Sequence, residues 1–203
     1  MKVLLINGSP RKNGNTYLCL KECASEIEKA GIETEIFQIG TKPVHGCIAC
    51  GACGREGHCV FTDDIMAEMQ QKMIEADGII VGSPVYYAGP NGTLCALLDR
   101  AFYSSAGKMK YKPAAAIAVC RRGGATATLE RLNKYFTISE MPLVSSMYWN
   151  LAHGGTPGEV LQDAEGLQTM RTLGKNMAFM LQKLSGEKWP KLQEDRVYTN
   201  FIR

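Results

Sequence analysis

VLLINGSPRKNGNT occupies residues 3–16 and decides the fold. Its four apolar residues at 3–6 predict a buried strand, and the polar turn after them leads into a helix that we expect over 16–30. A loop that leaves a strand and enters a helix exposes backbone N–H groups, and the helix dipole favours negative charge at the same point. The stretch therefore predicts a strand–loop–helix unit that holds a phosphate.

The loop supplies side chains that suit a phosphate dianion. Hydroxyl and amide groups donate hydrogen bonds, one guanidinium adds positive charge, and glycine lets the backbone approach closely. The residues concerned are Ser9, Arg11, Gly14, Asn15 and Thr16. The sequence has neither the lysine of a P-loop nor the dinucleotide motif GxGxxG, which disfavours a nucleoside triphosphate. A tight turn with a good helix cap is the alternative interpretation.

Apolar runs of strand length alternate with helical periodicity along the chain. We expect strands over 3–6, 33–37, 78–82, 113–120 and 142–148. Helices are expected over 16–30, 62–74, 91–103, 125–136 and 163–184. This order predicts an α/β fold with a doubly wound parallel sheet, and continuous apolar strands fit a sheet that helices cover on both faces. Ligands bind such sheets beyond the carboxyl ends of the strands.

Length and charge limit the alternatives. We expect one domain over residues 1–203, with a cysteine-rich loop inserted at 42–60 and a C-terminal tail at 186–203. A net charge of +3 gives no argument for nucleic acid or an anionic membrane. No apolar run approaches the roughly 20 residues of a membrane span, and the apolar start is too short for a signal peptide. We therefore expect a cytoplasmic protein with no nucleic-acid or membrane partner.

Two motifs resemble those of a known family. Asn7-Gly-Ser-Pro-Arg-Lys-Asn-Gly-Asn-Thr16 looks like the phosphate loop of the NADPH-dependent FMN reductase and iron–sulfur flavoprotein group. Gly82-Ser-Pro-Val-Tyr-Tyr-Ala-Gly89, followed by Leu97-Leu-Asp-Arg100, looks like the second flavin loop of that group. The resemblance extends from residue 1 to about residue 154. It implies a three-layer flavodoxin-like fold with five parallel strands in the order 2-1-3-4-5.

The resemblance also implies an FMN site. The residues of the first loop would hold the FMN phosphate, and the second loop would line the isoalloxazine ring and ribityl chain. The second-loop residues are Pro84, Val85, Tyr86, Tyr87 and Gly89. A flavin needs an apolar slot with aromatic walls, which these residues can form. The two tyrosines are ordinary core or surface aromatics in the alternative interpretation.

Two later segments complete the candidate cofactor site. Arg121, Gly123 and Gly124 follow the fourth expected strand, and a simple turn is the alternative there. His153 lies in a loop that we expect over 149–158, where it would sit near the flavin or the nicotinamide unless it is structural. In this family the flavin site commonly lies at a subunit boundary, so the resemblance implies a homodimer or homotetramer.

The cysteine motif is the second informative stretch. The chain has eight cysteines, and in a cytoplasmic protein they are thiols, ligands or redox groups rather than structural disulfides. Cys47, Cys50, Cys53 and Cys59 have the spacing C-x2-C-x2-C-x5-C, which is close to the bacterial ferredoxin pattern. The motif resembles that of iron–sulfur flavoproteins and implies a [4Fe–4S] cluster. Free or redox-active thiols and a zinc site remain alternatives.

These observations lead to two main hypotheses for function. In the first, the protein is an FMN-dependent oxidoreductase that takes a hydride from NAD(P)H and passes electrons on, through the cluster if one is present. No catalytic side chain is needed, because the flavin carries the chemistry. In the second, it is an electron carrier that takes electrons from a ferredoxin-like partner. A flavin- or phosphate-binding module without enzyme activity is a third, weaker hypothesis.

Overall fold

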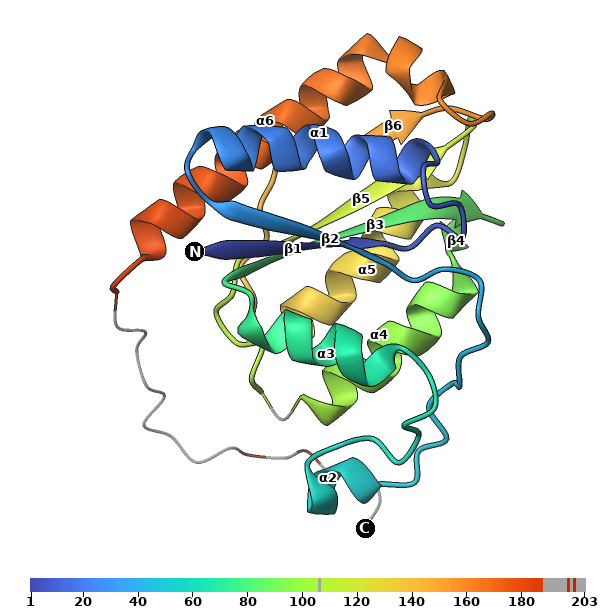
Figure 1. The fold of residues 1–203 in the computed structure, drawn as a ribbon, viewed down its shortest axis with the longest axis vertical. Helices are drawn as coiled ribbons and strands as arrows, with labels where there is room; N and C mark the ends of the chain where they lie inside the picture. The colour runs from blue at the N-terminus through green and yellow to red at the C-terminus, as the bar shows by residue number, and fades with distance from the viewer. Residues whose placement is uncertain (106, 188–196, 198, 200–203) are drawn as a thin grey trace.

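The computed structural model describes residues 1–105, 107–187, 197 and 199. Helices and strands alternate along the chain, as the sequence predicts (Figure 1). The strands are β1 Lys2–Asn7, β2 Glu33–Gln38, β3 Gly78–Tyr86, β4 Gly89–Pro90, β5 Ala114–Cys120 and β6 Leu151–His153. The helices are α1 Asn15–Lys29, α2 Ala52–Glu56, α3 Met66–Glu75, α4 Gly92–Ser104, α5 Ala125–Ile138 and α6 Ala164–Leu184, with a 3-10 turn at Glu159–Gln162. Most of the expected tail, 186–203, lies outside the described residues.

The parallel strands lie in the order β2-β1-β3-β5-β6. Counted over these five strands, the order is the predicted 2-1-3-4-5. The two-residue strand β4 pairs antiparallel with the end of β3 and was not expected. Within the described residues the sheet therefore has six strands, and its α/β parallel class is as predicted.

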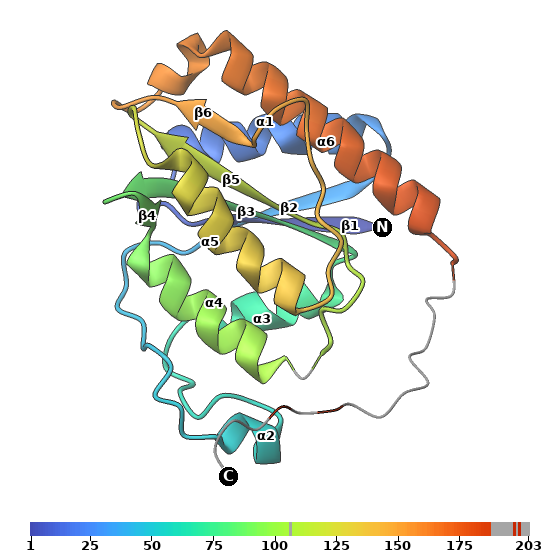
Figure 2. The ribbon, with the colours of Figure 1, turned by 180° about the vertical axis from the view of Figure 1, so that it is seen from behind.

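Helices cover both faces of the sheet (Figures 1 and 2). Helices α1 and α6 lie on one face, where their apolar residues pack on Val3 and Leu5 of β1. Helices α3, α4 and α5 lie on the other face and pack on Leu4 and Ile6. Alternate residues of one strand thus enter two cores, which explains why β1 reads as a continuous apolar run.

The fifth parallel strand lies later in the chain than predicted. The sequence predicted a strand over 142–148, but there the structure shows an isolated bridge between Leu143 and Ala114, and the strand is β6. Ser146 gives the physical reason, because its hydroxyl lies 2.6 Å from Tyr148 O and 2.7 Å from Asn150 Oδ1 and can donate its proton to either. Such local hydrogen bonds favour a turn over the hydrogen bonds between neighbouring strands of a sheet. His153 is consequently the last residue of the strand and does not lie in a loop after it.

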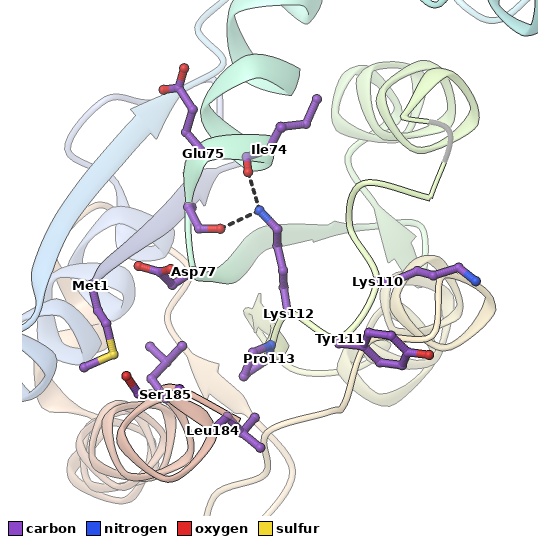
Figure 3. A pocket seen from close by; sticks show the side chains of 13 residues that line it. Met1, Ile74, Glu75, Asp77, Lys110, Tyr111, Lys112, Pro113, Leu184 and Ser185 are labelled. Atoms are coloured by element: carbon purple, nitrogen blue, oxygen red, sulfur yellow. Dashed lines mark hydrogen bonds between the residues drawn. The ribbon is translucent and has the colours of Figure 1, made fainter. Parts of the chain in front are cut away.

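A pocket also lies at the amino ends of the strands (Figure 3). There the Nζ of Lys112 donates hydrogen bonds to Met73 O at 3.1 Å, to Ala76 O at 2.6 Å and to Ile74 O. These carbonyls end α3, where the helix dipole favours a positive charge. Lys112 therefore serves the fold at the end of the sheet opposite to the candidate site.

Candidate active site

A pocket at the carboxyl end of the sheet gathers the predicted loops. Its cavity volume is about 230 Å³, and the pocket is partly open to solvent. Its walls come from the ends of β1, β3, β5 and β6. The lining residues are Ser9, Arg11, Asn15, Thr16, Pro84, Val85, Tyr86, Val119, Arg121, Gly154 and Gly155. Eight of them are predicted site residues, from three segments far apart in the sequence.

The first loop is held from the buried end of β1. Asn7 is fully buried, and its Oδ1 accepts a hydrogen bond from Ser9 N at 3.2 Å. Its Nδ2 donates to Gln38 Oε1, and Gln38 Nε2 donates in turn to Ser9 O at 2.6 Å. This closed set of bonds fixes the loop where Arg11 and Thr16 line the pocket.

The amino end of α1 faces the same pocket. Gly14 is its N-cap residue, and among the described residues no side chain caps the first turn. Its N–H groups are left for a ligand or water, and the helix dipole favours an anion there. Together with Arg11 this set of donors fits the phosphate of FMN.

Asn15 lines the pocket, and its side chain also bonds to a distant loop. Its Nδ2 donates to Thr156 O at 2.8 Å, and its Oδ1 accepts from Gly158 N at 2.8 Å. The side chain thus connects the start of α1 to the loop that precedes α6. In that loop the carboxylate of Glu159 accepts hydrogen bonds from Thr156 N and Gly155 N, which hold the pKa of Glu159 below its ordinary range.

The β3–β4 hairpin is strained at its tip. Tyr87 and Ala88 have φ angles of 49° and 58°, a left-handed conformation that residues with side chains seldom adopt. Tyr87 is fully exposed, and Tyr86 is half-exposed beside the pocket. Such strain tends to persist at functional sites.

The loop after β5 supports that hairpin. Gly124 has a φ of 88°, and a Cβ at this position would lie 2.6 Å from Ala88 Cα. Only glycine allows the two loops to approach this closely. Gly124 therefore shapes the site without lining the pocket. The other predicted residues that do not line it are Gly14, Tyr87, Gly89 and Gly123.

His153 lies at the border of the site. Its backbone N donates to Asp163 Oδ2 at 2.6 Å, and its Nδ1 lies 3.4 Å from the same oxygen. The next two residues, Gly154 and Gly155, form the pocket wall. Sequence reasoning missed both glycines and Val119, although the glycine pair after an apolar run was a usable signal.

The four cysteines of the motif line a second, narrow pocket of about 20 Å³. Cys47 and Cys50 are exposed, whereas Cys53 and Cys59 are partly buried. In the described part of the chain, no three His, Cys, Asp or Glu side chains lie close enough together to hold one metal ion. Four thiols on the wall of one cavity are nevertheless the donor set that a polynuclear iron–sulfur group requires.

The other four cysteines are packed in the layers of the fold. Cys19, Cys23 and Cys120 are buried and Cys95 is partly buried. Burial raises the pKa of Cys19 to about 12, which keeps it as an unreactive thiol.

The NADPH-dependent FMN reductase family profile matches residues 1–156. The chain belongs to this family. An iron–sulfur flavoprotein of Methanocaldococcus jannaschii is 40% identical over 186 residues, which cover 88% of this chain and 96% of the relative. An iron–sulfur flavoprotein of Methanosarcina thermophila is 34% identical over 189 residues, covering 90% and 96%.

The comparisons confirm the family resemblance and the flavodoxin-like fold. The structure of a flavodoxin from the domain Archaea superposes with a TM-score of 0.61 at 16% identity, over 90% of this chain and 99% of that one. Family membership makes the protein an FMN-dependent oxidoreductase. Within the described residues, none of the helices has the length and apolar character to span a membrane.

Proposed function

We propose that the protein is an FMN-dependent NAD(P)H oxidoreductase that passes electrons through a [4Fe–4S] cluster at Cys47, Cys50, Cys53 and Cys59. The observation that carries the FMN site is the convergence of three predicted loops on one pocket at the carboxyl end of the sheet. Support for NAD(P)H comes from the family description. Support for the cluster comes from the shared pocket of the four cysteines and from the iron–sulfur flavoprotein relatives.

The side chains of the first pocket would bind and orient FMN. Arg11, Ser9 and Thr16 would hold the phosphate with the amino end of α1, while Val85 and Tyr86 would contact the ring. FMN, when bound, supplies hydride acceptance and electron transfer, so the protein has to position the ring and limit its contact with water. Tyr87, at the exposed tip of the hairpin, would be accessible to a second substrate.

A second candidate is an electron carrier that receives electrons from a ferredoxin-like partner instead of NAD(P)H. The relatives named as iron–sulfur flavoproteins favour it, because they match 88% and 90% of this chain.

We also propose a homodimer or homotetramer. The exposed, edge-packed rings of Tyr148 and Trp149 support this, since aromatic residues are enriched in subunit contacts.

The two candidates differ in one measurement. The anaerobically purified protein, reconstituted with FMN, iron and sulfide, is mixed with NADPH, with NADH or with a reduced ferredoxin, and the flavin absorbance is followed. Rapid bleaching by NADPH or NADH supports the oxidoreductase. Bleaching by the ferredoxin alone supports the carrier, and a protein that binds no FMN contradicts both.

A matched pair of substitutions tests the phosphate site. Arg11→Ala should weaken FMN binding roughly tenfold to a hundredfold, because a charge-assisted hydrogen bond contributes about 1.5–3 kcal/mol. Lys12→Ala is the control, since Lys12 is exposed on the same loop but does not line the pocket. Equal FMN affinity in the two variants, measured by fluorescence titration, would show that the loop is misassigned.

A further inference from the structure

Arg100 is a buried charge that no step of the proposed reaction uses. It lies on α4, and its side chain is 1% exposed. Every hydrogen-bond acceptor recorded for its guanidinium belongs to the segment 45–64, which contains the cysteine pocket. The acceptors are His45 O at 3.2 Å, Cys59 Sγ at 3.3 Å, Phe61 O at 3.0 Å and the Asp64 carboxylate.

Of the four acceptors of the Arg100 guanidinium, the sulfur of Cys59 is the one that is needed neither to balance its charge nor to hold the segment. The Asp64 carboxylate balances the charge, and the two carbonyls would suffice to hold the segment on α4. A further donor, Nε–H, bonds to Cys59 Sγ, and both residues line the cysteine pocket. A guanidinium N–H that donates to a sulfur fixes the position of that sulfur, and such outer contacts orient the ligands of a metal site.

We propose that Arg100 is a positioning residue for the iron–sulfur cluster of the proposed function: its Nε–H fixes the Cys59 sulfur and raises the reduction potential of the cluster. The reason is electrostatic. Reduction adds one electron and therefore one negative charge to the cluster. A hydrogen bond to a ligand sulfur and a nearby positive charge both favour that state.

A purely structural role makes a different prediction. Arg100 also lies over the ring of Phe61, which stacks on His45, so its loss could loosen the segment without any effect on a cluster. Loosening changes stability and iron retention. A change of potential in a protein that keeps its iron needs an interaction with the cluster itself.

The experiment compares the reduction potential in reconstituted full-length proteins. Arg100→Lys keeps the charge but loses the planar fork of donors. The double variant Arg100→Gln with Asp64→Asn removes both charges of the buried pair together, so that neither is left uncompensated. Arg131→Gln is the control, because Arg131 contacts Asp99 and Tyr135 at the protein surface instead of the cysteines.

We expect the double variant to retain FMN and to have a more negative cluster potential. A tenfold change in the one-electron equilibrium, about 59 mV, is the expected size. Arg100→Lys should fall between the double variant and the wild type, and Arg131→Gln should match the wild type. Loss of iron with retained FMN in the Arg100 variants would instead favour the purely structural role, and the measurement on unmutated protein then decides between the two.

A measurement on unmutated protein covers the case in which the variants do not fold. Protein labelled with ¹⁵N-arginine should show hyperfine coupling between ¹⁵N and the reduced cluster, and Arg55→Lys should keep that coupling. Absence of the coupling, or an unchanged potential in an iron-loaded double variant, would overturn the role of Arg100 alone. Wild-type protein that takes up no iron would instead refute the proposed cluster, and the role of Arg100 with it.

Discussion

Single residues determine how closely the loops of the pocket approach one another. Gly124 and its neighbour Gly123 show this, because they differ in conformation and in free space. Gly124 has a positive φ and lies against Ala88, whereas a Cβ at Gly123 would meet nothing within 4 Å. Comparing the two glycines therefore separates the effect of the close approach at Gly124 from that of merely replacing a glycine in this loop.

Gly124→Ala should lower the free energy of unfolding by about 1–3 kcal/mol, the usual cost of a strained backbone position. It should also weaken FMN binding, because the added methyl group pushes the β3–β4 hairpin away from β5. Gly123→Ala is the control and should change little. Thermal denaturation and FMN titration of the two variants provide the test, and equal behaviour would contradict the close-approach argument.

The residues of the first loop could be predicted because their chemistry is local. A strand that ends in glycine, serine and an arginine before a helix carries its function in consecutive positions, and Arg11 and Thr16 line the pocket as expected. Asn15 could not be interpreted in this way. Its partners lie 141 to 145 positions further along the chain, and no local pattern reports a contact over that distance.

At the level of elements, Lys112 caps the carboxyl end of helix α3 from outside that helix. Lys112 precedes β5 and donates to three carbonyls at the end of α3, and Figure 3 shows the bond to Ile74 O. Lys110, two residues earlier, forms an exposed ion pair with Glu140. Substitutions of the two lysines therefore compare the contribution to stability of a buried ammonium group with that of an exposed one in the same segment.

Lys112→Met should reduce the free energy of unfolding by about 1–3 kcal/mol, because buried carbonyls would lose their hydrogen-bond partner. Lys110→Met should cost at most about 1 kcal/mol, as exposed ion pairs generally do. Urea denaturation of both variants measures the difference. A Lys112→Met protein as stable as Lys110→Met would show that water replaces the ammonium group without loss.

Most elements were predictable from periodicity, and the exceptions have identifiable causes. Long helices such as α6 carry a repeated apolar stripe that a sequence displays directly. The strand β6 is three residues long, and the more apolar segment before it is diverted into a turn by Ser146. Helix α2 has five residues, too few for any periodic signal.

At the scale of the molecule, the structure has two regions with different kinds of support. The sheet and its helices are held by two apolar cores. The segment 45–64, by contrast, is attached to α4 through Arg100 and its ion pair with Asp64. Figure 1 shows this segment, with α2, beyond α3 and α4. We therefore expect the segment to open under conditions that leave the sheet intact.

Acid should provide such a condition. Burial opposes ionisation of Asp64, but hydrogen bonds from Arg100, His45 N and Met66 N outweigh it and hold the pKa of Asp64 below its ordinary value of 3.8. The stabilisation by Asp64 is therefore complete well above pH 3.8 and is lost as the pH falls below 3.8 through the lowered pKa. Cleavage within 45–64 by an acid protease should increase over that range while the sheet stays protected.

Asp64→Asn is the matched variant for this prediction. It removes the titrating group, so cleavage of the segment should be faster than in the wild type and should no longer depend on pH in that window. If the sheet and the segment became sensitive together in the wild type, the two regions would be a single cooperative unit.

The link between Asn15 and Thr156 has a consequence for biosynthesis. Gly154 and Gly155 close the candidate pocket, and a ribosome adds them only after the loops that follow β1, β3 and β5 have been made. A nascent chain that has already formed the loop after β1 still lacks the backbone of Gly154 and Gly155, which forms the opposite wall of the pocket. We therefore expect FMN to bind late in synthesis. Chains truncated before Gly154 should be unable to retain FMN.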